Sequence, residues 1–305
     1  MDPLLATIAL PAVIMLGLGM SLTIADFARL RSHPRAVLLC LGCQIVVLPL
    51  ACLGLVLLFD PAPPLAVGML LLAASPGGTM ASLYSHLFGG NVALNIALTA
   101  VNSLIAVVTL PVITNLALAY FAGDDGTLGL QGGKLVQVCA VVLVPVAIGM
   151  LIRARRSRFA ERMERPVKIA SVLVLAALIT GAIAQEWANI GDYIVAVGAM
   201  VLIFNILSLA TGYWVPRWAG VGRPEAIASS MEIGLHNSTL ALAIALSPAL
   251  LNSTEVAIPV AVYGIVMQFT AAANGFILDR RHARRGERGG DRGGDHDTRS
   301  HDPII

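Results

Sequence analysis

The chain has 305 residues, of which 57% are hydrophobic and only 12% are charged, and its formal net charge is +2. An average soluble domain carries roughly 25% charged residues, so this composition excludes a soluble domain and indicates a polytopic membrane protein. The small net charge indicates no particular charged macromolecule as a partner, and the lipid bilayer is the partner we expect.

Nine apolar segments are long enough to cross about 30 Å of hydrocarbon as helices. They cover residues 3–25, 36–59, 65–88, 92–121, 134–152, 167–185, 193–215, 225–249 and 256–278. We expect the first segment to be retained, because the chain start, Met-Asp-Pro, lacks the basic region of a signal peptide. The sequence therefore predicts nine spanning helices.

The positions of the basic residues agree with this count, since Lys and Arg collect in cytoplasmic loops. With the N-terminus outside, 19 of the 20 basic residues fall in cytoplasmic segments and only Lys134 lies outside. The cytoplasmic basic residues lie within 29–35, 153–168, 217–223 and 280–299. We therefore expect a multi-pass protein of the inner (plasma) membrane with a cytoplasmic C-terminus.

Two other groups of residues indicate no further chemistry. Residues 280–305 mix Gly with Arg, Asp and Glu and contain no aromatic residue, which is typical of a disordered cytoplasmic tail rather than a nucleic-acid site. The four cysteines, at positions 40, 43, 52 and 139, lie inside apolar segments with no metal-ligand set nearby. We interpret them as small apolar side chains.

Glu232 lies inside the eighth apolar segment, where polar side chains and one glycine interrupt the apolar pattern between Ser229 and Thr239. An ionised carboxylate at the centre of a bilayer costs about 2.5 kcal/mol or more, so such residues usually mark an ion or substrate pathway. This stretch therefore predicts a site that holds a cation.

Two segments break the helical pattern at membrane depth, residues 75–82 in the third apolar segment and 232–239 in the eighth. Paired interruptions at corresponding positions of two halves predict an inverted-repeat secondary transporter with its site at the midplane. The alternative is a pair of Pro/Gly kinks that only shape packing. Thr79, and either Asn237 or Ser238, are good N-cap residues for the second half-helices, whose N-termini can hold an anion.

The sequence Ser-Pro-Gly-Gly-Thr at 75–79, the polar residues of 90–99 and Glu-x-Gly-x-His-Asn-Ser at 232–238 together resemble the bile acid:sodium symporter family (BASS). The resemblance covers nearly the whole membrane region. It implies an all-α inverted-repeat transporter over residues 1–279, with two crossed broken helices, that carries organic anions with sodium by alternating access. The core domain would cover about 65–152 and 225–279 with the 36–59 helix, and a panel domain the remaining helices.

The resemblance also implies two sodium sites that share Glu232. Site one would use Ser82, Asn95, Thr99 and Glu232, and site two would use Gln44, Glu232, Ile233, Leu235 and His236. A lone amide such as Gln44 is unfavourable to leave unpaired in lipid, and a sodium site gives it a partner. The alternative is a bond to a neighbouring helix backbone. Sodium would be the only metal, and no cofactor is expected.

Three features depart from the family pattern. His236 stands where the family often has Gln, and a neutral imidazole is a poorer ligand for a hard cation than an amide oxygen. A protonated His236 could instead pair with Glu232, so proton coupling is an alternative. Ala81 and Ser82 stand where the family often has Ser and Asn, and this chain aligns from the second of ten typical helices.

The half-helix N-termini favour a small or amphipathic organic anion as the substrate. The candidate contacts are Thr79, Asn237, Ser238, Gln268 and Asn102. The alternatives are a proton-coupled or uncoupled organic acid transporter, or an efflux permease for metalloids or organic solutes with a related fold. Residues 73–99 lack the cysteine expected for metalloid efflux. We expect a monomer and no enzyme activity, because Glu232 and His236 do not form the His-Glu-x-x-His zinc arrangement.

Overall fold

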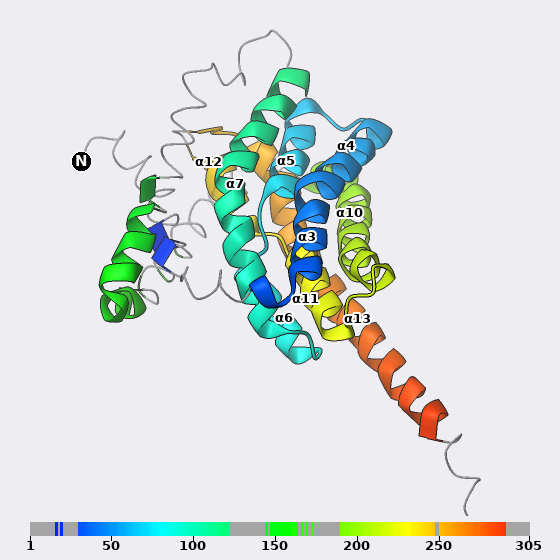
Figure 1. Ribbon diagram of the computed structural model, residues 1–305. Helices are drawn as coiled ribbons and strands as arrows, with labels where there is room; N and C mark the ends of the chain where they lie inside the picture. The colour runs from blue at the N-terminus through cyan, green and yellow to red at the C-terminus, as the bar shows by residue number, and fades with distance from the viewer. Residues whose placement is uncertain are drawn as a thin grey trace, which may run out of the picture.

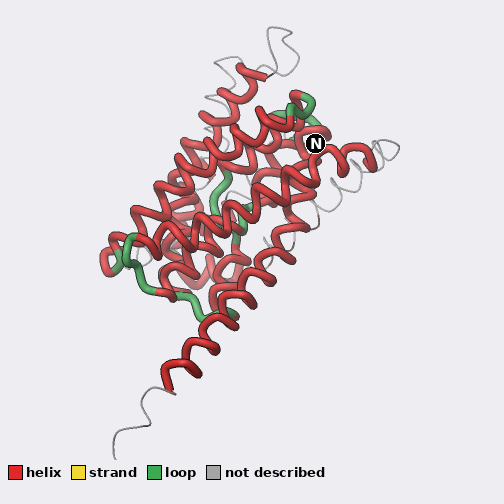
Figure 2. The backbone as a smooth tube through the Cα atoms, turned by 90° about the vertical axis from the view of Figure 1, so that its right-hand side faces the viewer, coloured by secondary structure: helices red, strands yellow, loops and turns green. Residues whose placement is uncertain are grey.

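The computed structural model describes residues 16, 17, 19, 20, 30–121, 144, 145, 147–163, 166, 169, 173, 190–247 and 250–290. In these residues the chain forms helices and one isolated β-bridge, and no strand (Figures 1 and 2). Four helices are long and apolar enough to cross a membrane: Pro34–Phe59, Val92–Phe121, Val197–Trp218 and Thr254–Leu278. The protein is therefore an all-α polytopic membrane protein, as its composition predicts.

The first of these spans contains a π-helical turn. It begins as α3 (Pro34–Gly42), passes through the turn (Cys43–Val47) and continues as α4 (Leu48–Phe59). Pro49 has no N–H, so the α-helical bond back to Ile45 cannot form and the hydrogen-bond ladder changes register there. The turn carries Gln44, whose side chain is buried.

The first predicted helix break is confirmed between α5 (Pro63–Ala74) and α6 (Thr79–Leu87). Ser75 has an extended backbone, because the following Pro76 disfavours the helical conformation in the residue before it. The N-cap of α6 is Gly78, so the prediction that Thr79 caps this helix is wrong: Thr79 is already the first helical residue. Because glycine has no side chain, the N-cap of α6 provides no side-chain acceptor for the first N–H groups of the helix.

The second predicted break is confirmed between α11 (Arg223–Gly234) and α12 (Ser238–Leu246). Asn237 caps α12, since its side-chain oxygen accepts a hydrogen bond from the N–H of Leu240 at 3.0 Å. This is the capping role expected from the sequence. Both broken helices therefore consist of two half-helices joined by a short non-helical segment.

The remaining long helices are α7 (Val92–Phe121), α10 (Ile190–Trp218) and α13 (Thr254–Gly290). They pack with the broken helices in one bundle, in which α10 contacts α11 and α13, and α5 contacts α7 and α13 (Figure 1). The resemblance assigns the 193–215 helix to the panel. In the structure α10 packs beside the second break, where Met200, Phe204 and Leu209 form a buried inner face.

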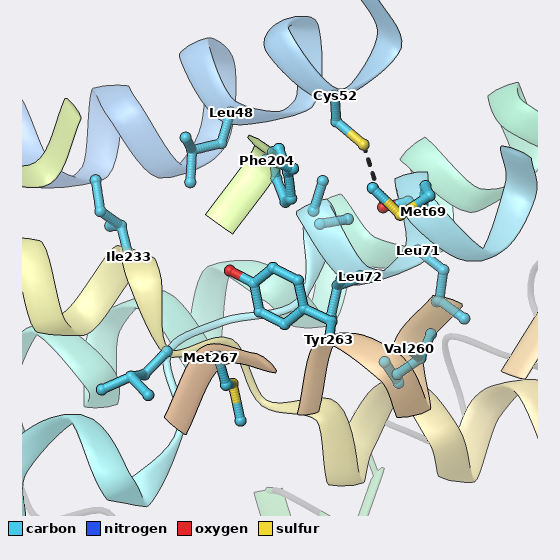
Figure 3. Packing of buried hydrophobic residues seen from close by; sticks show 14 of the residues in the cluster. Leu48, Cys52, Met69, Leu71, Leu72, Phe204, Ile233, Val260, Tyr263 and Met267 are labelled. Atoms are coloured by element: carbon cyan, nitrogen blue, oxygen red, sulfur yellow. Dashed lines mark hydrogen bonds between the residues drawn. The ribbon is translucent and has the colours of Figure 1, made fainter. Parts of the chain in front are cut away.

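Buried side chains from both halves of the sequence meet at the centre of the bundle (Figure 3). Leu48 and Cys52 of α4 lie there with Met69 of α5 and Tyr263 of α13. Cys52 donates its S–H to the carbonyl of Met69 at 3.3 Å. The other described cysteines, at positions 40 and 43, are also buried and free, while position 139 lies outside the described residues.

A further helix around residues 147–155 lies to one side of the bundle (Figure 1). It approaches residues 16–20 closely, since a Cβ placed on Gly149 would lie 2.4 Å from the carbonyl oxygen of Leu16. Only a glycine permits this contact. The predicted spans 3–25, 134–152 and 167–185 otherwise lie largely outside the described residues.

The last helix extends beyond the predicted membrane span. α13 continues to Gly290 and so covers 280–290, the first part of the segment expected to be a disordered tail. Arginine, the commonest residue of this part, is a good helix former, and a helix that is already formed can propagate through it. Residues 291–305 lie outside the described residues.

Candidate functional site

The two helix breaks lie against each other and are joined by backbone hydrogen bonds. Gly77 and His236 form an antiparallel β-bridge. On either side of it, the N–H of Gly78 donates to the carbonyl of Leu235 at 2.7 Å, and the N–H of Asn237 donates to the carbonyl of Pro76 at 2.8 Å. Backbone groups freed at membrane depth need such partners, so each break satisfies the other.

Glu232 lies in the last turn of α11, beside this bridge, and is 0% exposed. One carboxylate oxygen accepts from the hydroxyl of Thr99 at 2.5 Å and the other accepts from the amide of Asn102 at 3.0 Å. The backbone of Gly77 provides a further hydrogen bond. All three partners are neutral, and the ion pairs found in the described part of the chain involve Glu225 and Glu161 instead. A buried carboxylate held only by neutral donors is suited to bind a cation.

The residues of the first predicted sodium site lie on α6, α7 and α11, which pack against one another. Thr99 contacts Glu232 directly, and its hydroxyl also lies 3.1 Å from the carbonyl of Asn95. Asn95 donates its amide N–H to the carbonyl of Ala228, one turn before Glu232, at 2.9 Å. Its side-chain oxygen is buried and has no hydrogen-bond partner in the described structure. Ser82 is partly buried on α6, which packs against both α7 and α11.

Two residues of the second predicted sodium site, Gln44 and His236, lie at the carbonyl of Ser75. Gln44 donates to this carbonyl at 2.9 Å and to that of Ala73 at 3.3 Å. The Nδ1 atom of His236 lies 3.1 Å from the same Ser75 oxygen. Because a carbonyl can only accept, Nδ1 carries a proton, and in a neutral imidazole Nε2 is then left as an acceptor. Both Nε2 of His236 and Oε1 of Gln44 are buried without a partner in the described structure.

Ile233 and Leu235, the other members of this predicted site, are buried beside the break. The carbonyl of Leu235 already accepts from Gly78, but an oxygen has two lone pairs and retains capacity for a cation. The described structure thus places unpaired acceptors at both predicted positions. The alternative for Gln44, a bond to a neighbouring helix backbone, is also observed, because its N–H₂ group donates to the carbonyls of Ala73 and Ser75.

Two residues that the sequence analysis missed hold the second break in place. Asn205 and Tyr263 both donate to the carbonyl of Gly234, at 2.8 and 2.9 Å. The ring of His236 stacks on Phe204, with the centroids 5.8 Å apart and the planes at 1°. Phe204 and Tyr263 lie side by side in the buried cluster of Figure 3. A lone amide inside the apolar segment 193–215 is the signal that could have identified Asn205.

We expect Tyr263→Phe to destabilise the protein by about 1 kcal/mol, because it removes one buried hydrogen bond to the Gly234 carbonyl and leaves the bond from Asn205. The measurement is thermal unfolding of purified protein in detergent. Tyr120→Phe is the control, since Tyr120 is 70% exposed. Equal unfolding temperatures for Tyr263→Phe and wild type would show that this bond does not hold the break.

The residues expected to contact the substrate separate into two groups. Asn237 and Ser238 lie at the start of α12, where the hydroxyl of Ser238 points to the sulfur of Met267 at 4.0 Å. Gln268 is half-buried on α13, and its backbone carbonyl accepts from the hydroxyl of Tyr84 at 3.0 Å. Thr79 begins α6 near the bridge.

Asn102 forms the second group by itself. It donates to Glu232 and therefore belongs with Thr99 around the carboxylate. The hydrogen bond from Asn102 to Glu232 joins α7 to α11.

Sequence comparison with known proteins shows the family to which the chain belongs. A profile of the Sodium Bile acid symporter family matches residues 7–193, which include Gln44, the first break and α7. The Bacillus subtilis protein named uncharacterized sodium-dependent transporter YocS is 26% identical over 234 residues, which are 76% of this chain and 71% of that protein. The rice protein named probable sodium/metabolite cotransporter BASS2, chloroplastic, is 26% identical over 264 residues, 85% of this chain and 60% of the relative.

A mammalian relative shows the same similarity. The rabbit ileal sodium/bile acid cotransporter is 24% identical over 231 residues, which are 75% of this chain and 65% of that protein. The chain thus spans less than two thirds of the rice and rabbit relatives. The family profile nevertheless covers more than half of this chain, and it includes the first helix break. This protein therefore belongs to the sodium bile acid symporter family.

Proposed function

We propose that the protein is a sodium-coupled symporter of small or amphipathic organic anions that works by alternating access. The observation that carries this proposal is the buried carboxylate of Glu232, which lies at the contact between two helix breaks with neutral donors around it. Relatives named as sodium-dependent transporters and sodium/metabolite cotransporters support sodium as the coupling ion.

Oxygen ligands favour a hard alkali cation at this carboxylate. Site one would consist of Ser82, Asn95, Thr99 and Glu232, and the unpaired oxygen of Asn95 supports it. Site two would consist of Gln44, Glu232, Ile233, Leu235 and His236, with the unpaired acceptors of Gln44 and His236 as support. Each cation would offset the charge of the carboxylate, which is costly to bury alone.

The substrate would be held at the start of the second half-helices. The N–H groups of α6 and α12 point out of their N-termini on the two sides of the bridge, and an anion is favoured at such positions. Thr79, Asn237, Ser238 and Gln268 are the proposed contacts. The two described breaks contain no Lys or Arg that could clamp the anion, so the site suits organic acids of several shapes.

Two sodium ions that enter with one monoanion down a tenfold gradient and 100 mV would supply about 5 kcal/mol. One sodium ion would supply only about 1.4 kcal/mol, because the process is then electroneutral. We further propose a monomer in the plasma membrane, with the N-terminus outside and the C-terminus cytoplasmic. The division into a moving core and a panel belongs to the same proposal.

The test is uptake of a panel of labelled organic acids into proteoliposomes that contain the purified full-length protein. Uptake is measured with an inward gradient of sodium, of potassium or of protons. The proposal requires accumulation of at least one acid that depends on sodium. Uptake of an acid at the same rate in potassium would contradict symport with sodium, and dependence on the proton gradient alone would favour the proton-coupled alternative.

His236→Gln is expected to increase apparent sodium affinity by several fold or to steepen the sodium dependence of uptake. The reason is that an amide oxygen replaces Nε2, a weaker ligand for sodium. The initial rate of uptake at increasing sodium concentration measures both effects. His86→Gln, an exposed position at the end of α6, is the control. If sodium dependence is unchanged in His236→Gln, the imidazole is no ligand.

A further inference from the structure

The side-chain amide of Asn102 is hydrogen-bonded at its N–H₂ end and unpaired at its oxygen end in the described structure. It lies on α7 three residues after Thr99 and is 2% exposed. Its N–H end donates to Oε1 of Glu232 at 3.0 Å, while Thr99 donates to Oε2. Its oxygen end is buried and lacks a hydrogen-bond partner among the described residues. Residues three apart on a helix share a face, so α7 covers each carboxylate oxygen with one side chain.

The unpaired oxygen of Asn102 is matched by a second one on the same face of α7. Asn95 lies seven residues earlier, two helical turns away, and its Oδ1 is also buried without a partner in the described chain. Buried polar groups are normally paired, and an unpaired one calls for an explanation. The two amides flank the position of Thr99, and both donate their N–H₂ groups to α11, the helix that carries the carboxylate, while their oxygens stay unpaired in the described structure. Such oxygens are ligands of the kind that hard cations prefer.

The two ends of an asparagine amide are almost equal in size, and the last side-chain bond has a broad, roughly two-fold preference. A half-turn about this bond therefore exchanges the oxygen and the N–H₂ group without displacing neighbours. In one orientation Asn102 donates to the carboxylate. In the other it presents an oxygen beside the carboxylate, where that oxygen would repel Glu232 unless a cation lay between them.

We propose that Asn102 is a cation ligand whose side-chain amide turns over when the cation binds. Without a cation its N–H₂ group donates to Glu232, and when a sodium ion binds there the amide turns its oxygen to the ion. This inference rests on the proposed function and deepens it. It moves Asn102 from the substrate contacts, where the sequence suggested it, to the coupling-ion site, and it adds a ligand to the set that the family resemblance implies. Asn102 then stabilises the Glu232 carboxylate both with and without bound sodium.

The experiment measures stabilisation by sodium alone, with no organic acid present, because a ligand that binds only the folded state raises its unfolding temperature. Purified full-length wild type, Asn102→Ala and Asn102→Asp are titrated with NaCl, with choline chloride added to hold ionic strength constant. We expect the sodium concentration for half-maximal stabilisation to rise about tenfold or more in Asn102→Ala. Asn115→Ala is the matched control, since this amide of α7 donates to its own helix at Pro111.

Asn102→Asp gives the sharper result. An aspartate cannot donate to Glu232 when both are ionised, and two adjacent carboxylates repel each other without a cation. We therefore expect a lower unfolding temperature than wild type in choline and a larger rise with sodium. A residue that only fills space or joins two helices would not produce this increase. Asn102→Ser, which keeps one oxygen and less bulk, replaces Asn102→Ala if the alanine variant does not fold, and an intermediate sodium requirement is expected.

The outcomes separate the inference from the function on which it rests. If wild type responds to sodium and Asn102→Ala responds at the same concentration, Asn102 is no ligand and the inference is overturned. An increase in the KM of the organic acid at saturating sodium, with the sodium titration unchanged, would return Asn102 to the substrate site. If wild type shows neither stabilisation nor uptake with sodium, the proposed function itself fails and the inference fails with it.

Discussion

Glu232→Gln is expected to abolish sodium-dependent uptake and to leave the protein folded. The carboxylate is the charged group at the contact between the two breaks, and both proposed cation positions share it. Removing one partner of a buried charge pair costs about 3 to 5 kcal/mol, so we expect sodium affinity to fall by a factor of about 100 or more. The measurement is uptake against sodium concentration in proteoliposomes.

Glu232→Gln should lower sodium affinity, but it should not lower the stability of the sodium-free protein. A neutral amide is less costly to bury than a carboxylate, so the unfolding temperature without sodium should equal or exceed that of wild type. Sodium should no longer raise it. Glu255→Gln, in the first turn of α13, is the matched control and should retain both responses. Sodium-driven accumulation by Glu232→Gln would rule out this carboxylate as the coupling site.

Gly77→Ala should have the second largest effect, because a side chain at this position meets the carboxylate. A Cβ on Gly77 would lie 2.2 Å from Oε1 and 2.3 Å from the carboxyl carbon of Glu232. The end of a glutamate side chain can move, so we expect the carboxylate to shift rather than the bundle to unfold. That shift would break the bonds from Thr99 and Asn102 and weaken sodium binding by at least about tenfold.

Gly54→Ala separates this effect from a general cost of placing alanine in the membrane bundle. A Cβ on Gly54 meets no atom within 4 Å, so this variant of α4 should transport as wild type does. Both variants are compared by uptake at increasing sodium concentration and by thermal unfolding with and without sodium. A Gly77→Ala protein with the sodium dependence of wild type would show that the carboxylate does not need its observed position.

Local features of the sequence predicted the parts of the site that local physics controls. Pro76 forces Ser75 out of the helix, Asn237 caps the helix that follows it, and Glu232 is conspicuous in an apolar segment. The prediction that Thr79 caps α6 was wrong, because side-chain preference cannot show where the helical conformation begins.

Contacts between distant segments could not be predicted in this way. The antiparallel bridge joins residues whose separation in the chain exceeds 150 positions, and no periodicity signals it. Asn205 and Tyr263 support the carbonyl of Gly234 from two other helices. Asn102 was assigned to the substrate because spacing along α7 does not show which way its amide points. Gln44 was found through the family resemblance, and its place beside Ser75 depends on the π-helical turn.

The bridge between the breaks also restricts how the transporter can move. Sliding one broken helix past the other would separate the two backbone hydrogen bonds that flank Gly77 and His236, in a region where no lipid group can replace them. Movement of both broken helices as one rigid body keeps these bonds and is therefore less costly. The cation and the anion would then move together with both broken helices, and the sliding surfaces would lie between these helices and the rest of the protein.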